Sequence, residues 1–330
     1  MSQPILKREQ IPTDKKIFLV HGNSARNLDI GKYFLKLDTV SFSDFEPNPQ
    51  KKSINKGVEK FLESQADIIM AIGGGSAIDV AKSIRAFSQR NVTLIAVPTT
   101  AGSGSESTRF AVFYDGKQNS GITGEALLPD AIILEPEVLL TLPEYQKKCT
   151  VLDALSQAIE SLWAVKSNET SRQFSTKAIE LILNNVDGYL QNQNLTEIMY
   201  GSNFAGRAIN ITGTTAGHAM SYKFTSEYKI PHGAAVAMCN NVLWNYVQSN
   251  EVICTDPRGR EYIEDIFRVL SPTMEIFQRL VKDWNITFDK KMPESEILFF
   301  AAQVNPAQLE NFPVRLDFDT IKNLYREISK

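Results

Sequence analysis

The sequence predicts an α/β N-terminal domain with a mostly parallel sheet, followed by an all-α C-terminal domain. Over residues 1–142, short apolar runs alternate with helical patterns, whereas from residue 143 to 330 helical periodicity continues with almost no convincing strand. The chain has 330 residues and 43% of them are hydrophobic, which is enough to build a sizeable core. We therefore expect two domains, 1–142 and 143–330.

Apolar runs predict the strands of the first domain, and helical spacing predicts the segments between them. The predicted strands are Lys16–Val20, Thr39–Phe42, Ile68–Ile72 and Thr93–Val97. The predicted helices are Lys56–Ser64 and Ala77–Ser88. Two closely spaced prolines make Asp44–Pro49 an irregular segment.

The second domain shows one helical pattern after another. The predicted helices are Val151–Val165, Thr170–Gln191, Leu195–Asn210, Tyr262–Leu270, Thr273–Trp284 and Phe318–Ser329. Ser271-Pro272 predicts a break or kink between the fourth and fifth of these, because proline lacks the N–H that a helix interior needs.

Composition excludes several classes of protein. Thirty-five basic against 38 acidic residues give a net charge of −3, without the basic excess of a nucleic-acid-binding protein. No apolar run reaches the roughly 18 residues of a membrane span, and the polar N-terminus does not resemble a signal peptide. Three widely spaced cysteines predict reduced thiols. We expect a cytoplasmic protein without nucleic-acid or membrane partners.

Glycine-rich turns follow two of the predicted strands. After Ile68–Ile72, Gly74 and Gly75 expose backbone N–H groups at a helix N-terminus, which suits a phosphate. Ser76 is expected to cap that helix, and Asp79 to lie in its first turn. The alternative is a tight turn with a good cap and no ligand. The pattern also differs from GxGxxG, so it does not predict a standard Rossmann fold.

The second turn, Val97–Glu106, gathers small residues and hydroxyls. Two such loops after parallel strands should meet at the carboxyl edge of the sheet, where a nucleotide is the natural ligand. His21 follows the first strand, and we interpret it as a solvated loop residue.

Two of the three histidines, His218 and His232, fall in one short stretch. Upstream, Asp153 and Gln157 are spaced i and i+4, so they share one face of a predicted helix. Imidazole and carboxylate groups are ligands for Zn²⁺ or Fe²⁺. Ordinary packed or solvated histidines are the alternative.

Together these motifs resemble the iron-containing (group III) alcohol dehydrogenases. GGGSAIDVAK, PTTAGSGSE, LLPDAIILEPEVLLTLP, DALSQAIE and GHAMSY…IPHG occur in the family's order between residues 15 and 240. The resemblance implies a dinucleotide-binding domain over 1–142 and a helical metal- and substrate-binding domain over 143–330. It also implies hydride transfer between NAD(P)H and an alcohol/aldehyde pair, a divalent metal (Fe²⁺ ahead of Zn²⁺) and a homodimer.

The resemblance assigns cofactor-binding roles by position. The matching residues are Gly74, Gly75, Ser76 and Asp79 around the pyrophosphate, and Thr99, Thr100 and Ser103 beside the nicotinamide. Lys117 is the best candidate for the family's lysine after the second loop, with an exposed lysine as the alternative. Asp44 corresponds loosely to the acidic residue that discriminates NAD from NADP, and the choice between the two stays open.

The resemblance also implies a metal site. Asp153, His218 and His232 match three of the family's four ligands, and Gln157 stands where most members have a histidine. An amide oxygen is a poorer ligand for a transition metal than imidazole. The glutamine leaves three possibilities open: the site binds the metal more weakly, it prefers another ion, or it binds no metal. Tyr222 replaces a further histidine and either donates a proton or packs.

FSDFEPNP, ESLWAVKS, AINITGTTAGHAMSYK and VNPAQLENFPV resemble the phosphonoacetaldehyde reductase (2-hydroxyethylphosphonate dehydrogenase) branch of the family. A phosphonate needs a cation, and Lys223 is our candidate ahead of Arg207. Alternatives are a general short-chain alcohol dehydrogenase and a metal-free nucleotide-binding member without catalysis. Dehydroquinate synthase-like lyases are disfavoured, because the chain lacks their richer set of charged residues around the metal.

Overall fold

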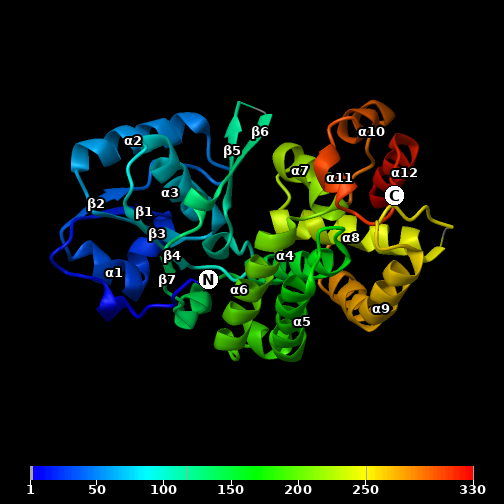
Figure 1. Cartoon of the computed structure of the whole chain (residues 1–330), viewed down its shortest axis with the longest axis horizontal. Coiled ribbons are helices and arrows are strands. Elements are labelled where there is room, and N and C mark those ends of the chain that lie inside the picture. Colours follow the sequence, from blue (N-terminus) through cyan, green and yellow to red (C-terminus); the bar gives the residue numbers. More distant parts are fainter. Residues whose placement is uncertain (1–2, 117, 250, 330) are drawn as a thin grey trace. The chain divides into compact units, whose positions relative to one another are not determined.

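The computed structural model describes residues 3–116, 118–249 and 251–329 (Figure 1). The chain divides into two compact units, Met1–Leu142 and Pro143–Lys330. Unit 1 contains every strand found among the described residues, and unit 2 is helical. The predicted fold class is therefore confirmed.

The sheet of unit 1 has five strands within the described part of the chain, in the order β2-β1-β3-β4-β7. Every neighbouring pair is parallel. The strands are β1 (Ile17–His21), β2 (Thr39–Phe42), β3 (Ile68–Gly73), β4 (Thr93–Pro98) and β7 (Ala131–Ile132). Because the strand order reverses direction between β1 and β3, the carboxyl ends of these two strands form the switch point where ligands of such sheets bind.

Apolar side chains hold helices against this sheet. Phe18, Ile69 and Leu94 of the strands share one buried core with Phe61 of α2 and Ile84 of α3. The helices of unit 1 are α1 (Asp29–Leu35), α2 (Lys51–Ser64) and α3 (Gly75–Ser88). A separate antiparallel pair is formed by β5 (Phe110–Asp115) and β6 (Gln118–Thr123).

The four predicted strands are confirmed within one residue at either end. The fifth strand, β7, and the β5–β6 pair were not predicted from the apolar pattern. β7 is only two residues long, which is too short for a periodicity to register. Helix α3 begins at Gly75, two residues before the predicted start.

Unit 2 is built around α4, which packs against α5, α6 and α8. From Val151 to Trp163 every residue of α4 is buried, so this helix is the centre of the unit. The helices are α4 (Glu144–Trp163), α5 (Glu169–Leu190), α6 (Leu195–Thr212), α7 (Ala216–Tyr228), α8 (His232–Ser249), α9 (Arg260–Asp283), α10 (Glu294–Ala301), α11 (Pro306–Glu310) and α12 (Phe318–Ile328).

Of the break or kink predicted at Ser271-Pro272, the break is wrong, because α9 continues through Pro272 as a single helix. Its buried face runs on at helical spacing, with Phe267 and Leu270 before the proline and Met274 and Phe277 after it. Pro272 itself is exposed. Apolar packing on the opposite face continues across the proline and outweighs the local penalty of the lost helical hydrogen bond.

The three cysteines are free thiols, as predicted. Among the described residues, no helix is both long and apolar enough to cross a membrane.

Candidate active site

The two glycine-rich loops of unit 1 lie against each other, as predicted. A Cβ atom on Gly75 would come within 2.8 Å of Ser103 Oγ, and one on Gly74 within 3.4 Å of Thr100. The backbone N–H of Thr99 donates to the carbonyl of Gly73 at 3.0 Å. Gly75 is therefore required by the close approach of the second loop, which leaves no room for a side chain.

The start of α3 corrects two predictions. The N-cap is Gly74, and the helix has no side-chain cap, so Ser76 is the second helical residue and does not cap it. Asp79 lies in the second turn and not in the first. The N–H groups at the start of a helix lack helical partners, so this end of α3 offers donors to an anion.

Asp79 and Lys82 anchor the second loop on α3. The Asp79 carboxylate accepts hydrogen bonds from Ser105 Oγ at 2.5 Å and from the Val112 N–H at 3.1 Å. Lys82 Nζ donates to Ser105 Oγ, Thr108 Oγ1 and the Phe110 carbonyl. Lys82 is fully buried, and burial lowers its pKa to about 8 despite the nearby carboxylates.

Three further predicted residues are placed differently. The interpretation of His21 as a solvated loop residue is wrong, because it is the last residue of β1 and only 1% exposed. Burial lowers its pKa, so the ring is neutral at pH 7. Asp44 is exposed after β2 and forms an ion pair with Lys56 at 2.8 Å. Lys117 lies outside the described residues.

Unit 2 brings together three of the predicted metal ligands. Asp153 of α4, His218 of α7 and His232 of α8 place potential ligand atoms within 4.8 Å of one another. His218 Nε2 lies 3.5 Å from Asp153 Oδ1, and the two imidazole rings are 5.4 Å apart. A single divalent cation can bridge such a set, and one carboxylate with two imidazoles is a donor set typical of Zn²⁺ or Fe²⁺.

Glycines next to both histidines allow the three helices to approach. Gly217 precedes His218, and a Cβ atom there would meet Asn240 Oδ1 at 1.9 Å. Gly233 follows His232, and its Cβ would meet the carbonyl oxygen of Cys149 at 1.9 Å. The convergence of the three candidate ligands therefore depends on two positions where no side chain fits.

Glu160 lies on α4 one turn after Gln157, and the sequence analysis did not single it out. It is fully buried, and its Oε1 accepts a hydrogen bond from His218 Nδ1 at 2.7 Å. The spacing was a usable signal, because Asp153, Gln157 and Glu160 follow one another at i, i+4 and i+7 on one helix face.

The charges of the cluster are strongly coupled. Burial alone would lower the pKa of His218, but the carboxylates of Glu160 and Asp153 raise it to about 10. Burial lowers the pKa of His232, although Asp153 opposes this, so that ring is neutral at pH 7 and offers a lone pair. Burial would raise the pKa values of Asp153 and Glu160, but the histidines outweigh it and lower both.

Gln157 and Tyr222 lie beside the ligands. Gln157 is 3% exposed, and its Nε2 donates to Asp153 Oδ1 at 3.2 Å. The ring of Tyr222 stacks on His232 with 4° between their planes, and its hydroxyl accepts a hydrogen bond from Gln308 Nε2 at 3.0 Å. Gln308 belongs to α11 and was not predicted to lie here, because 86 residues separate it from Tyr222.

The two cations considered for a phosphonate have local partners. Lys223 Nζ lies 5.0 Å from the ring centroid of Phe299 on α10. The Arg207 guanidinium hydrogen-bonds to Asn203 at 2.9 Å and lies over Phe204. Lys223 is five residues from His218, so it projects from a different face of α7.

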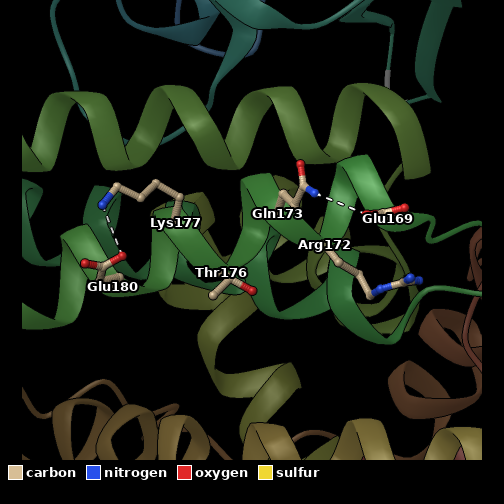
Figure 2. A pocket seen from close by; sticks show the side chains of 6 residues that line it. All are labelled: Glu169, Arg172, Gln173, Thr176, Lys177 and Glu180. Atoms are coloured by element: carbon tan, nitrogen blue, oxygen red, sulfur yellow. Dashed lines mark hydrogen bonds and ion pairs between the residues drawn. The ribbon is translucent and has the colours of Figure 1, made fainter.

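A surface hollow along α5 is unrelated to the metal cluster (Figure 2). Its lining side chains are Glu169, Arg172, Gln173, Thr176, Lys177 and Glu180, all from this one helix. Lys177 pairs with Glu180 at 3.1 Å, and Gln173 donates a hydrogen bond to Glu169. Arg172 donates a hydrogen bond to the Tyr262 hydroxyl. None of these six side chains is buried.

The family models match both units. Residues 6–136 match the model described as iron-containing alcohol dehydrogenase, and residues 148–283 match the C-terminal model of the same family. The chain belongs to the iron-containing alcohol dehydrogenase family. The resemblance found in the sequence is thus confirmed.

The curated proteins to which the chain is similar are named for different substrates. Phosphonoacetaldehyde reductase of Streptomyces viridochromogenes is 29% identical over 240 residues, which are 63% of this chain and 60% of that protein. 4-Hydroxybutyrate dehydrogenase of Clostridium kluyveri is 33% identical over 252 residues, 68% of this chain and 64% of that protein. Both alignments span less than two thirds of the relatives' length.

Solved structures of the iron-containing alcohol dehydrogenase family share the fold. An iron-containing alcohol dehydrogenase from Thermotoga maritima has a TM-score of 0.86 at 23% identity, covering 99% of this chain and 98% of that one. Sulfoacetaldehyde reductase from Bifidobacterium kashiwanohense, solved in complex with NAD⁺, has a TM-score of 0.83 at 23% identity, covering 96% and 91%.

Proposed function

We propose that this protein reduces an aldehyde to an alcohol with a reduced nicotinamide cofactor and a divalent metal. The observation that carries the proposal is the cluster of Asp153, His218 and His232, whose ligand atoms converge within 4.8 Å. Membership of the iron-containing alcohol dehydrogenase family supports the reaction type.

Unit 1 would bind NAD or NADP through its two loops. Gly74, Gly75 and Ser76 would present backbone donors to the pyrophosphate, and Thr99, Thr100 and Ser103 would lie along the nicotinamide. Asp79 supports this site, because its carboxylate accepts a hydrogen bond from Ser105 of the second loop. Asp44 would contact the adenine ribose, and Lys117 would serve as a further cofactor-binding residue. When bound, the cofactor supplies the hydride.

Asp153, His218 and His232 would hold the metal, with Gln157 beside them in place of a fourth strong ligand. When bound, a divalent ion polarises a carbonyl oxygen as a Lewis acid. Because the neutral His232 presents a lone pair, it needs no proton loss to bind, whereas His218 must release a proton. Fe²⁺ is the preferred ion of the proposal, ahead of Zn²⁺.

Tyr222 would donate the proton that the substrate oxygen gains as the carbonyl carbon receives hydride. Its ring lies parallel to His232, with 6.1 Å between the ring centroids, and Gln308 fixes the hydroxyl oxygen by a hydrogen bond. The Tyr222 ring beside His232 and the hydrogen bond to its hydroxyl support this role.

Phosphonoacetaldehyde is the proposed substrate, and 2-hydroxyethylphosphonate the product. Among the similar proteins, phosphonoacetaldehyde reductase, sulfoacetaldehyde reductase and 4-hydroxybutyrate dehydrogenase are all named for molecules with an anionic group. Lys223 would meet that anion as a point charge. A general short-chain alcohol dehydrogenase is the second candidate, favoured by relatives named for 1-propanol and methanol.

The test follows the loss of reduced-nicotinamide absorbance with Fe²⁺ or Zn²⁺ present and phosphonoacetaldehyde or acetaldehyde as substrate. Oxidation of NADH or NADPH with phosphonoacetaldehyde alone supports the full proposal. Turnover of acetaldehyde as well would discard the phosphonate specificity. Tight cofactor binding without turnover of either would favour a binding-only protein.

The Lys223→Met variant tests the anion contact. The KM for phosphonoacetaldehyde should rise by about tenfold, because one charge-assisted contact is lost. The affinity for NADH, measured by fluorescence titration, should stay the same, because Lys223 belongs to α7 and not to the nucleotide loops. An unchanged KM for phosphonoacetaldehyde would remove Lys223 from the site.

A further inference from the structure

Glu160 is the point where the three ligand-bearing helices are tied together. It lies on α4, two turns after Asp153, and its side chain is completely buried. An isolated buried carboxylate is costly, so donors must surround it. Those donors come from α7 and α8, the two helices that carry His218 and His232.

Five donors converge on the two carboxylate oxygens of Glu160. Oε2 accepts from the Thr215 N–H at 2.5 Å and the Thr215 hydroxyl at 2.9 Å. Oε1 accepts from the His218 N–H at 3.2 Å, from His218 Nδ1 at 2.7 Å and from Asn240 Nδ2 at 3.0 Å. Thr215 is the N-cap of α7 and uses no side-chain cap of its own, so Glu160 caps this helix from α4.

The contact with the ring decides which nitrogen of His218 faces the cluster. Because Glu160 accepts from Nδ1, that nitrogen keeps its proton when the ring releases the other one, and Nε2 is directed toward Asp153 at 3.5 Å. A carboxylate behind a ligating imidazole fixes the tautomer and the ring orientation. Asn240 extends the same support to α8, two turns after His232.

We infer that Glu160 is the positioning residue of the metal centre: it holds His218 with Nδ1 protonated and Nε2 as the metal ligand, and it sets the spacing of α4, α7 and α8. The inference rests on the proposed metal site. Glutamine cannot replace it, because both oxygens receive donors and an amide would turn its NH₂ group toward one of them.

The first experiment measures Co²⁺ binding by the visible absorption of the bound ion, for the whole chain and for Glu160→Gln. The variant should bind Co²⁺ about 10- to 100-fold more weakly. Glu106→Gln is the matched control, because Glu106 is a buried glutamate of unit 1, and its Co²⁺ affinity should equal that of the unmodified chain. Equal affinity of Glu160→Gln and the unmodified chain would overturn the inference.

The second experiment uses ¹⁵N-histidine NMR of the Zn²⁺-loaded, unmodified protein, and so decides the matter even where the variant does not fold. Only three histidines contribute signals. His218 should keep a protonated Nδ1 and bind Zn²⁺ through Nε2, and ligation through Nδ1 would overturn the inference. Failure to bind either ion would overturn it together with the metal site. If binding depends on Glu160 but no aldehyde is reduced, only the proposed reaction fails.

Discussion

In unit 1 the proposed nucleotide loops present backbone N–H groups and small side chains. In unit 2 the candidate metal cluster combines the buried, charged side chains of Asp153 and His218 with the neutral, half-buried His232, each from a different helix. The loops follow β3 and β4, which are neighbouring strands of the sheet. The cluster joins Asp153, His218 and His232 across 80 residues and relies on Glu160 behind them. A site made of backbone should therefore respond gradually to substitution, and a site made of buried charges abruptly.

Gly233→Ala should have the largest effect. The added methyl group would overlap the Cys149 carbonyl oxygen at 1.9 Å and Asp153 Cβ at 2.9 Å, so α8 must move away from α4. We expect the free energy of unfolding to fall by about 3 kcal/mol, the upper end of usual overpacking costs, with loss of Co²⁺ binding. Urea denaturation and Co²⁺ absorption measure both. Gly22→Ala is the control, because no atom lies within 4 Å of that Cβ position.

Gln157→His would sharpen the contrast by giving the cluster another imidazole. Because imidazole is a stronger ligand than an amide for transition metals, the affinity for Co²⁺ should rise about tenfold or more. Isothermal titration measures the change. Gln173→His, on the exposed face of α5, introduces the same residue away from the cluster and should leave the affinity unaltered. A fall in affinity at position 157 would exclude this side chain from the ligand shell.

Gly75→Ala should affect only the nucleotide loops. Its methyl group would press on Ser103 Oγ at 2.8 Å, and displacement of the second loop should weaken NADH binding by about tenfold. Fluorescence titration with NADH measures this, and Co²⁺ affinity serves as the internal control. Loss of both NADH binding and Co²⁺ binding would show that the two sites do not respond independently.

Lys82→Met removes the buried amine that donates hydrogen bonds to Ser105 and Thr108. Burial lowers the folded-state pKa of Lys82 to about 8, while the unfolded chain keeps about 10.4. Between these values the unfolded state holds the extra proton, so the stability of the unmodified protein relative to Lys82→Met should rise with pH over this window and stay level below pH 8. Urea denaturation from pH 7 to 10.5 checks the sign. A relative stability that falls over the window would contradict the buried, easily deprotonated amine.

Local pattern predicted much of unit 1 and of the ligand set. Ile68–Ile72 and Thr93–Val97 were identified as strands because continuous apolar runs that end in glycine or small polar residues are typical of buried parallel strands. Local pattern left both a break and a kink open at Pro272, and packing on both sides of the proline excludes the break. It failed at His21, since a single histidine at the end of an apolar run does not reveal whether it is covered.

The sequence by itself determined the division into an α/β part and a helical part, the positions of both glycine-rich loops, and three candidate ligands. Only the tertiary structure decided that Asp79 faces Ser105 and that Glu160 stands behind His218. The physical reason is that periodicity reports which face of an element is buried, whereas a buried charge is defined by its partners. Those partners, such as Asn240 for Glu160, lie 80 residues away in the chain and meet only when the helices pack.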